Sequence, residues 1–231
     1  MSRLRNPGLV LLQHPIPVTI GPGGLAPVFA LGALFAMISM QGGLPIATAT
    51  VIGAIGGTAS LIVHELGHVR AARKLTGLRP TGVSLIWLGA ATRLEGAYLS
   101  GRDQAKVAIA GPRASFGVAI ALIPVLFLPI PVGLKDIVIT LAALNVAIGV
   151  LSLIPANPLD GHKLIVGLLW SALGTEAAAR RLIRRLALTW VAVEIVGAGV
   201  LLVERPLLGA TVVVAGVSLF GQKLFARRHC A

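Results

Sequence analysis

The sequence predicts an all-α polytopic membrane protein with about six transmembrane helices. Hydrophobic residues make up 56% of its 231 residues and charged residues only 12%, a balance that excludes an ordinary soluble domain. A membrane span takes about 20 apolar residues of helix. We therefore expect one membrane-embedded domain over residues 1–231, with several spans and no separate soluble domain.

Six apolar windows follow one another along the chain and qualify as spans. They are Leu25 to Met40, Ile46 to Leu66, Ala105 to Leu128, Ile137 to Ile154, Leu186 to Val203 and Leu207 to Phe225. The stretch Leu164 to Leu173 is apolar but too short to span, so it predicts a buried or interfacial helix. The domain then divides into an N-terminal strand and first helix (1–45), a three-helix core (46–163) and C-terminal helices (164–231).

The segment Gly82 to Leu94, between the second and third windows, predicts short strands. It is rich in glycine and β-branched residues and too polar at its end for a span. The N-terminal segments Leu9 to Leu12 and Val18 to Ile20 have a similar character. We expect these segments to pair into a small sheet near the cytoplasmic face.

The net charge of +12 is distributed as membrane topology would distribute it. If the N-terminus with Arg3 and Arg5 is cytoplasmic and six helices follow, only Lys135 and Arg205 of the twenty basic residues fall outside. This bias predicts that the N- and C-termini are cytoplasmic and that the chain is an integral protein of a plasma membrane. We expect the basic residues to contact the anionic leaflet of that membrane rather than nucleic acid. The cluster Arg180 to Arg185 anchors this topology or also holds anionic lipid.

The five residues His64-Glu65-Leu66-Gly67-His68 follow a charge-free run of eighteen residues that begins at Ile46. Residues four apart on a helix project from one face, so both imidazoles can bind one metal ion. Glu65 would lie beside that ion, where a carboxylate can accept a proton from water. The only cysteine is Cys230, which leaves nitrogen and oxygen ligands for the metal.

A catalytic zinc usually has three protein ligands. Asp160 is the favoured third ligand among the remaining histidines and acids, because Pro155 and Pro158 must break the helix just before it. Broken backbone at membrane depth is tolerated where protein or a water-filled cavity surrounds it. A metal site would supply such a cavity.

His64-Glu65-Leu66-Gly67-His68 followed by Asn157-Pro158-Leu159-Asp160-Gly161 resembles the site-2 protease family of intramembrane zinc metalloproteases. The likeness extends to Leu88-Gly89-Ala90-Ala91 and Ala110-Gly111-Pro112, and covers roughly Ile46 to Lys163. It implies that His64, His68 and Asp160 bind one Zn²⁺ per chain and that Glu65 is the catalytic base. It also implies cleavage of transmembrane substrates in regulated intramembrane proteolysis, with an anti-sigma factor as the natural guess, in a prokaryotic plasma membrane with the active site toward the cytoplasmic half.

The chain departs from the family pattern at the substrate-binding positions. The family often has Asn seven or eight residues before its metal Asp, where this chain has Leu153 and Ser152, and Asn three residues after its Gly-Pro, where it has Ser115. Asn145 shares a helical face with Ser152. Asn145, Ser152, Asn157 and Ser115 are therefore the substrate-binding candidates.

Two further questions stay open at this point. The strands could capture an unwound substrate by β-addition, or the segment Gly82 to Leu94 could be a re-entrant loop that only plugs the site. A zinc-binding transporter or a catalytically silent membrane chaperone would also place histidines and acids in a helix bundle. A transporter predicts repeats, and the sequence has no second copy of the His-containing helix; the intact set His64, Glu65, His68 and Asp160 argues against a silent protein.

Overall fold

A computed structural model describes residues 9–12, 16–21, 23–39, 44–87 and 89–185. Strands β1 (Leu9–Leu12) and β2 (Val18–Ile20) precede helices α1 (Ala26–Ser39) and α2 (Ile46–Ala72). Strands β3 (Leu78–Ile86) and β4 (Gly89–Gly96) follow, and then α3 (Gly101–Leu122) with a 3₁₀ turn (Ile123–Phe127), α4 (Val132–Ser152) and α5 (Asp160–Leu173). Residues 176–185 are also helical.

Three helices in the described residues are long and apolar enough to cross a membrane. They are α2, α3 with its 3₁₀ turn, and α4, of 27, 27 and 21 residues. The predicted span over Leu25 to Met40 is shorter than expected, because α1 has 14 residues and rises only about 21 Å against a hydrocarbon core of about 30 Å. The predicted spans Leu186 to Val203 and Leu207 to Phe225 lie outside the described residues.

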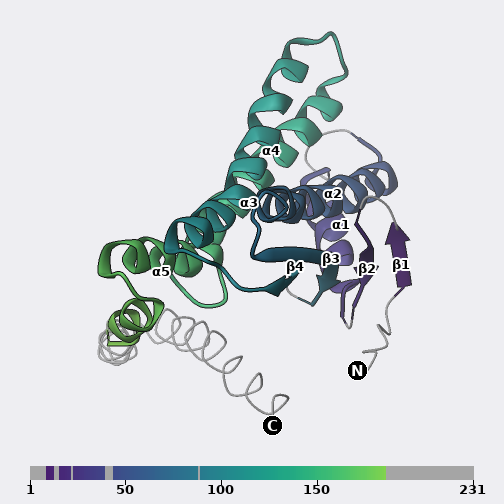
Figure 1. Cartoon of the computed structure of the whole chain (residues 1–231). Coiled ribbons are helices and arrows are strands. Elements are labelled where there is room, and N and C mark those ends of the chain that lie inside the picture. Colours follow the sequence, from purple (N-terminus) through teal and green to yellow (C-terminus); the bar gives the residue numbers. More distant parts are fainter. Residues whose placement is uncertain (1–8, 13–15, 22, 40–43, 88, 186–231) are drawn as a thin grey trace, which may run out of the picture.

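The predicted strands form one four-stranded sheet in the order β1-β2-β3-β4, with only the β2–β3 pair parallel. The first two strands have the predicted bounds, whereas β3 begins four residues earlier than Gly82, at Leu78. Val18 and Val83 on one face of the sheet pack with Val69 of α2. In Figure 1, α3 and α4 run together to the top and the sheet lies below them, beside α1 and α2.

Glycines let the helices that carry the site approach closely. A Cβ at Gly67 of α2 would meet the backbone oxygen of Ala110 at 2.5 Å, and one at Gly167 of α5 would meet the backbone oxygen of Gly101 at 2.6 Å. The α3 N-terminus is also tied to α5 by a hydrogen bond of 2.9 Å from Gln104 Nε2 to the Lys163 carbonyl oxygen. Helix α3 therefore contacts both the helix with the two histidines and the helix that begins at Asp160.

Candidate metal centre

Three buried polar side chains lie four residues apart along one face of α2: Ser60, His64 and His68. The spacing follows the helical repeat of 3.6 residues, so the face turns only slowly along the axis. Helix α3 covers the two histidines, because Gly111 lies against the Nε2 atoms of both. The histidine pair predicted to share one face does share it, inside the protein rather than toward lipid.

The Nδ1 atom of each histidine has a hydrogen-bond partner. His64 Nδ1 lies 2.9 Å from Ser115 Oγ, and His68 Nδ1 lies 2.7 Å from the carbonyl oxygen of Val107. The Val107 carbonyl can only accept, so His68 donates its Nδ1 hydrogen to it, and a neutral His68 would then carry its lone pair on Nε2. A donated proton from His64 to Ser115 gives the same tautomer, and such outer partners orient metal-binding imidazoles.

Pro112 lies inside α3, one turn beyond Ala108. Its ring nitrogen carries no hydrogen, so the Ala108 carbonyl loses its usual intrahelical donor and the preceding turn is loosened. Val107, the residue before Ala108, offers its carbonyl to His68. The Ala110-Gly111-Pro112 step thus shapes the part of α3 that faces the histidines.

Asp160 is the first residue of α5 and points at both histidines. Its Oδ2 atom lies 3.1 Å from His64 Nε2 and 2.9 Å from His68 Nε2. Its other oxygen, Oδ1, accepts from Lys163 Nζ at 3.0 Å. Burial raises the pKa of the Asp160 carboxyl, but hydrogen bonds with the two histidines and the charges of His68 and Lys163 outweigh it and hold that pKa well below its usual value.

The turn before α5 places Asp160 there. After α4 ends at Ser152, the chain doubles back so closely that a Cβ at Gly161 would meet the carbonyl oxygens of Leu153 and, at 2.6 Å, Ile154. Glycine is required for this approach of two backbone segments. A carboxylate in the first turn of a helix also interacts favourably with the helix dipole.

The residues present fit a zinc ion. Two imidazole nitrogens and a carboxylate oxygen are the ligand types that zinc takes, and tetrahedral ligands of zinc lie about 3.3 Å apart, close to the 2.9 and 3.1 Å separations here. The missing side chain of Gly111 leaves the space between them. A Cβ at that position would fall on His68 Nε2 and lie 2.6 Å from His64 Nε2.

Glu65 lies next to this centre and has a different partner. Its carboxylate can approach the two histidine ligand atoms, the three lying within 4.8 Å of one another. Thr92 of β4 donates a hydrogen bond of 2.6 Å to Glu65 Oε2. Asp160 Oδ2 instead lies within hydrogen-bond distance of both Nε2 atoms.

The four substrate-binding candidates fall in different places. Ser115 is fully buried against His64, and fully buried Asn145 donates to Ser60 Oγ and the Leu141 carbonyl, both at 2.8 Å. Ser152 donates to the Gly149 carbonyl at the end of α4, and Asn157 is exposed in the following loop. The structure thus brings Ser115 to the metal centre and Asn145 to within one helical turn of it, through Ser60.

Sequence reasoning did not find the roles of Thr92 and Gly111. Thr92 reaches Glu65 across 27 positions of chain, and no local pattern marks such a contact. Gly111 belongs to the Ala110-Gly111-Pro112 motif, but its role is to leave space beside the two histidine Nε2 atoms. That space exists only once α2 and α3 are packed together.

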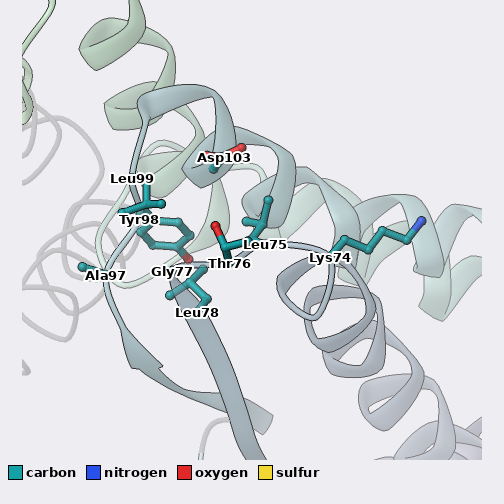
Figure 2. A pocket seen from close by; sticks show the side chains of 9 residues that line it. All are labelled: Lys74, Leu75, Thr76, Gly77, Leu78, Ala97, Tyr98, Leu99 and Asp103. Atoms are coloured by element: carbon teal, nitrogen blue, oxygen red, sulfur yellow. The ribbon is translucent and has the colours of Figure 1, made fainter.

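A small pocket of about 130 Å³ lies between the connections from α2 to β3 and from β4 to α3. Figure 2 shows the Tyr98 ring turned toward Thr76 and Gly77, with Lys74 extending away from the other labelled side chains. Burial, and then the negative charge of Asp160, raise the pKa of the Tyr98 hydroxyl. The pocket contains none of the candidate metal ligands.

No family model matches the sequence. Three curated relatives carry names of zinc metalloproteases. Rip3 of Mycobacterium tuberculosis is 32% identical over 60% of this chain and 37% of its own, sll0528 of Synechocystis is 30% identical over 62% and 38%, and MJ0392 of Methanocaldococcus jannaschii is 32% identical over 48% and 32%. The names of Rip3 and sll0528 give their zinc metalloprotease activity as inferred. The chain spans about a third of the length of these relatives.

The fold has a counterpart among solved structures. The site-2 protease from Methanocaldococcus jannaschii matches with a TM-score of 0.55 and 20% sequence identity, covering 92% of both chains. At that identity the likeness establishes the fold, while the curated relatives supply the sequence link. In sequence the chain is similar to proteins named as zinc metalloproteases, and its fold is that of a site-2 protease.

Proposed function

We propose that this protein is an intramembrane zinc metalloprotease that cleaves transmembrane segments of other membrane proteins. The observation that carries the proposal is the convergence of Asp160 Oδ2, at the start of α5, on His64 Nε2 and His68 Nε2 of α2. Glu65 lies beside the two histidines, and α2 is apolar enough to cross a membrane. A purely structural polar cluster would not need a carboxylate that stands next to the ligands and binds a separate partner.

In this proposal one zinc ion per chain is held by His64, His68 and Asp160. A zinc ion in such a site acts as a Lewis acid, lowering the pKa of water and polarising a carbonyl. Glu65 accepts the proton that water loses and delivers it to the leaving amine. His64 and His68 would offer their Nε2 lone pairs to the ion, because Ser115 and Val107 are the partners of their Nδ1 atoms.

The charges of the loaded site suit its depth in the membrane. A divalent cation with ionised Asp160 and Glu65 sums to zero, which lowers the cost of burying all three groups. The two carboxylates also have partners of their own, Lys163 and Thr92. These charges and partners lower the free-energy cost of burying the histidines and Glu65 in the membrane.

The sheet offers a way to hold the substrate. A transmembrane helix must unwind before it can be cut, because its carbonyls are hydrogen-bonded within the helix. In the described part of the chain β4 is the last strand of the sheet, and Thr92 in that strand touches Glu65. An unwound substrate added to β4 would run beside the base, which supports β-addition over a plug.

Ser115 and Asn145 are the favoured substrate-side groups near the metal, ahead of Ser152 and Asn157. In the present arrangement both amide hydrogens of Asn145 are donated and its buried Oδ1 has no hydrogen-bond partner. Asn145 would therefore accept a hydrogen bond from a substrate N–H or a water. Polarisation of a substrate carbonyl is left to the metal and to Ser115.

The proposed orientation places the metal end of the bundle toward the cytoplasm. Arg70, Lys74, Lys106 and Arg113 line a groove of about 590 Å³ between α2 and α3, and Lys163 lies on α5. Lys135 is in the first turn of α4, at the opposite end of that helix from the turn leading to Asp160. A cytoplasmic leaflet would stabilise this distribution, and a single-span regulator such as an anti-sigma factor in a prokaryotic plasma membrane is the proposed substrate class, cut in regulated intramembrane proteolysis.

The experiment compares purified wild type with Glu65→Gln in cleavage of a membrane-span peptide, with zinc content measured in both. We expect equal zinc and a rate lowered at least about 100-fold in the variant, as for loss of a general base. Equal cleavage by both proteins would overturn the protease assignment. Zinc in both with cleavage by neither would favour a transporter or a catalytically silent chaperone.

A further inference from the structure

The Thr92 hydroxyl is bonded to the Glu65 side chain and lies near its backbone. Thr92 Oγ1 is 2.6 Å from Glu65 Oε2 and 3.1 Å from the Glu65 carbonyl oxygen. Both are acceptors when Glu65 is ionised, so the threonine donates, and the shorter, charged contact is the stronger one. The carboxylate is therefore attached to β4 as well as to its own helix.

The fold presents Thr92 to the helix rather than to solvent. Thr92 pairs with Val83, which is fully buried, and the neighbouring α2-facing residue of β4, Ala90, packs in the same cluster as Val69. Side chains two apart on a strand share a face. Thr92 thus lies on the face of the sheet that α2 covers, in contact with Glu65.

A glutamate side chain has three rotatable bonds, and without a partner its carboxylate would sample several positions around the metal centre. One short hydrogen bond selects among those positions. A hydroxyl can donate to a carboxylate and can accept from a carboxylic acid. The contact therefore persists after Glu65 has accepted a proton, with the Thr92 hydrogen then turned to the Glu65 carbonyl.

We propose that Thr92 is a positioning residue, which fixes the Glu65 carboxylate against β4 so that the base and a substrate strand added to β4 share one rigid frame. The inference rests on the proposed protease function. It assigns to β4 two tasks in one place, because the strand that would hold the unwound peptide also aims the group that moves the proton.

Three variants test the inference. Thr92→Val keeps the shape and strand preference of threonine but removes the hydroxyl, Thr92→Ser keeps the hydroxyl, and Thr81→Val is the matched control on β3, where the threonine makes only a 3.5 Å contact to the Arg93 carbonyl. We expect Thr92→Val to lower kcat about 10- to 100-fold, the usual range for partners of catalytic groups. KM and zinc content should stay at wild-type values, Thr92→Ser should recover most of kcat, and Thr81→Val should match wild type.

The outcomes separate this inference from the proposed function. Wild-type kcat in Thr92→Val, or an equal loss in the valine and serine variants, would overturn the positioning role. A change confined to KM would assign Thr92 to substrate binding and would also overturn it. If Thr92→Val does not fold, as judged by its zinc content and thermal unfolding, Thr92→Ala replaces it with the same expectations. Failure of the wild type itself to cleave while zinc-loaded would instead refute the protease function.

Discussion

The two halves of α2 differ in what fixes their side chains. In the first half, Ile46 to Gly57, the contacts are apolar and rely on missing side chains: a Cβ at Gly53 would overlap the ring of Phe35, and one at Gly57 would lie 2.9 Å from Leu31. In the second half, Ser60 to Ala72, the buried side chains that face the bundle include Ser60, Glu65 and both histidines, each with a hydrogen-bond partner.

This difference shows how one helix can serve as a membrane span and as half of a metal centre. Apolar side chains of the first half face outward, with Val51 and Ile55 more than half exposed, as suits contact with lipid. The second half is enclosed by α3, the sheet and the start of α5. Substitutions in the first half should therefore change stability, and substitutions in the second half should change metal binding and activity.

The largest expected effect comes from filling the space at Gly111. Gly111→Ala would place a methyl group on the two Nε2 atoms, so we expect zinc binding to be lost, with activity reduced by more than about 100-fold. Gly117→Ala, on the same helix with nothing within 4 Å of its Cβ, is the control and should retain zinc. Metal analysis of both variants after purification measures this. A zinc-replete Gly111→Ala would show that the metal lies elsewhere.

A smaller effect is expected from the partner of His64. Ser115→Ala removes the hydrogen bond to His64 Nδ1, and loss of such an outer partner typically weakens metal affinity about 10- to 100-fold. Competition with a fluorescent chelator gives the zinc affinity. Thr140→Val, which removes a hydroxyl bonded only to its own helix at the Asp136 carbonyl, should leave the affinity unchanged. Equal zinc affinity in Ser115→Ala and wild type would show that the hydrogen bond from His64 to Ser115 of α3 does not support metal binding.

The smallest expected effect on activity comes from the first half of α2. Gly53→Ala should destabilise the fold by about 1–3 kcal/mol through overpacking against Phe35, with zinc per folded chain and kcat retained. Gly56→Ala should cost less, because its Cβ would meet only the end of the Leu141 side chain, at 3.0 Å. Unfolding in mild detergent measures both. Zinc loss in Gly53→Ala, while the protein stays folded, would erase the distinction between the halves.

Much of the site was predictable because its signals are local. His64 and His68 reveal their shared face by their spacing, and Asp160 follows prolines that must end a helix. The strands Leu9–Leu12 and Val18–Ile20 have the predicted bounds, because short runs of apolar and β-branched residues favour strands.

The remainder depends on contacts distant in sequence. Composition predicted a first span over Leu25 to Met40, and α1 lies within one residue of these bounds at Ala26–Ser39, but at 14 residues it is too short to span. Helix α5 begins at Asp160 rather than Leu164, since an acidic residue favours a helix N-terminus as much as an apolar run does. The pairing of Thr92 with Glu65 needs the sheet to be assembled on α2.

The claim that His64, His68 and Asp160 hold a catalytic zinc is tested by removing and restoring the metal in one preparation. The wild type is stripped with a chelator in detergent, and cleavage of one membrane-span peptide is followed before and after zinc is added back. We expect no cleavage by the stripped protein and full recovery at one zinc per chain, with His64→Ala not recovering. Full cleavage by the stripped protein, or recovery in His64→Ala equal to wild type, would contradict the account.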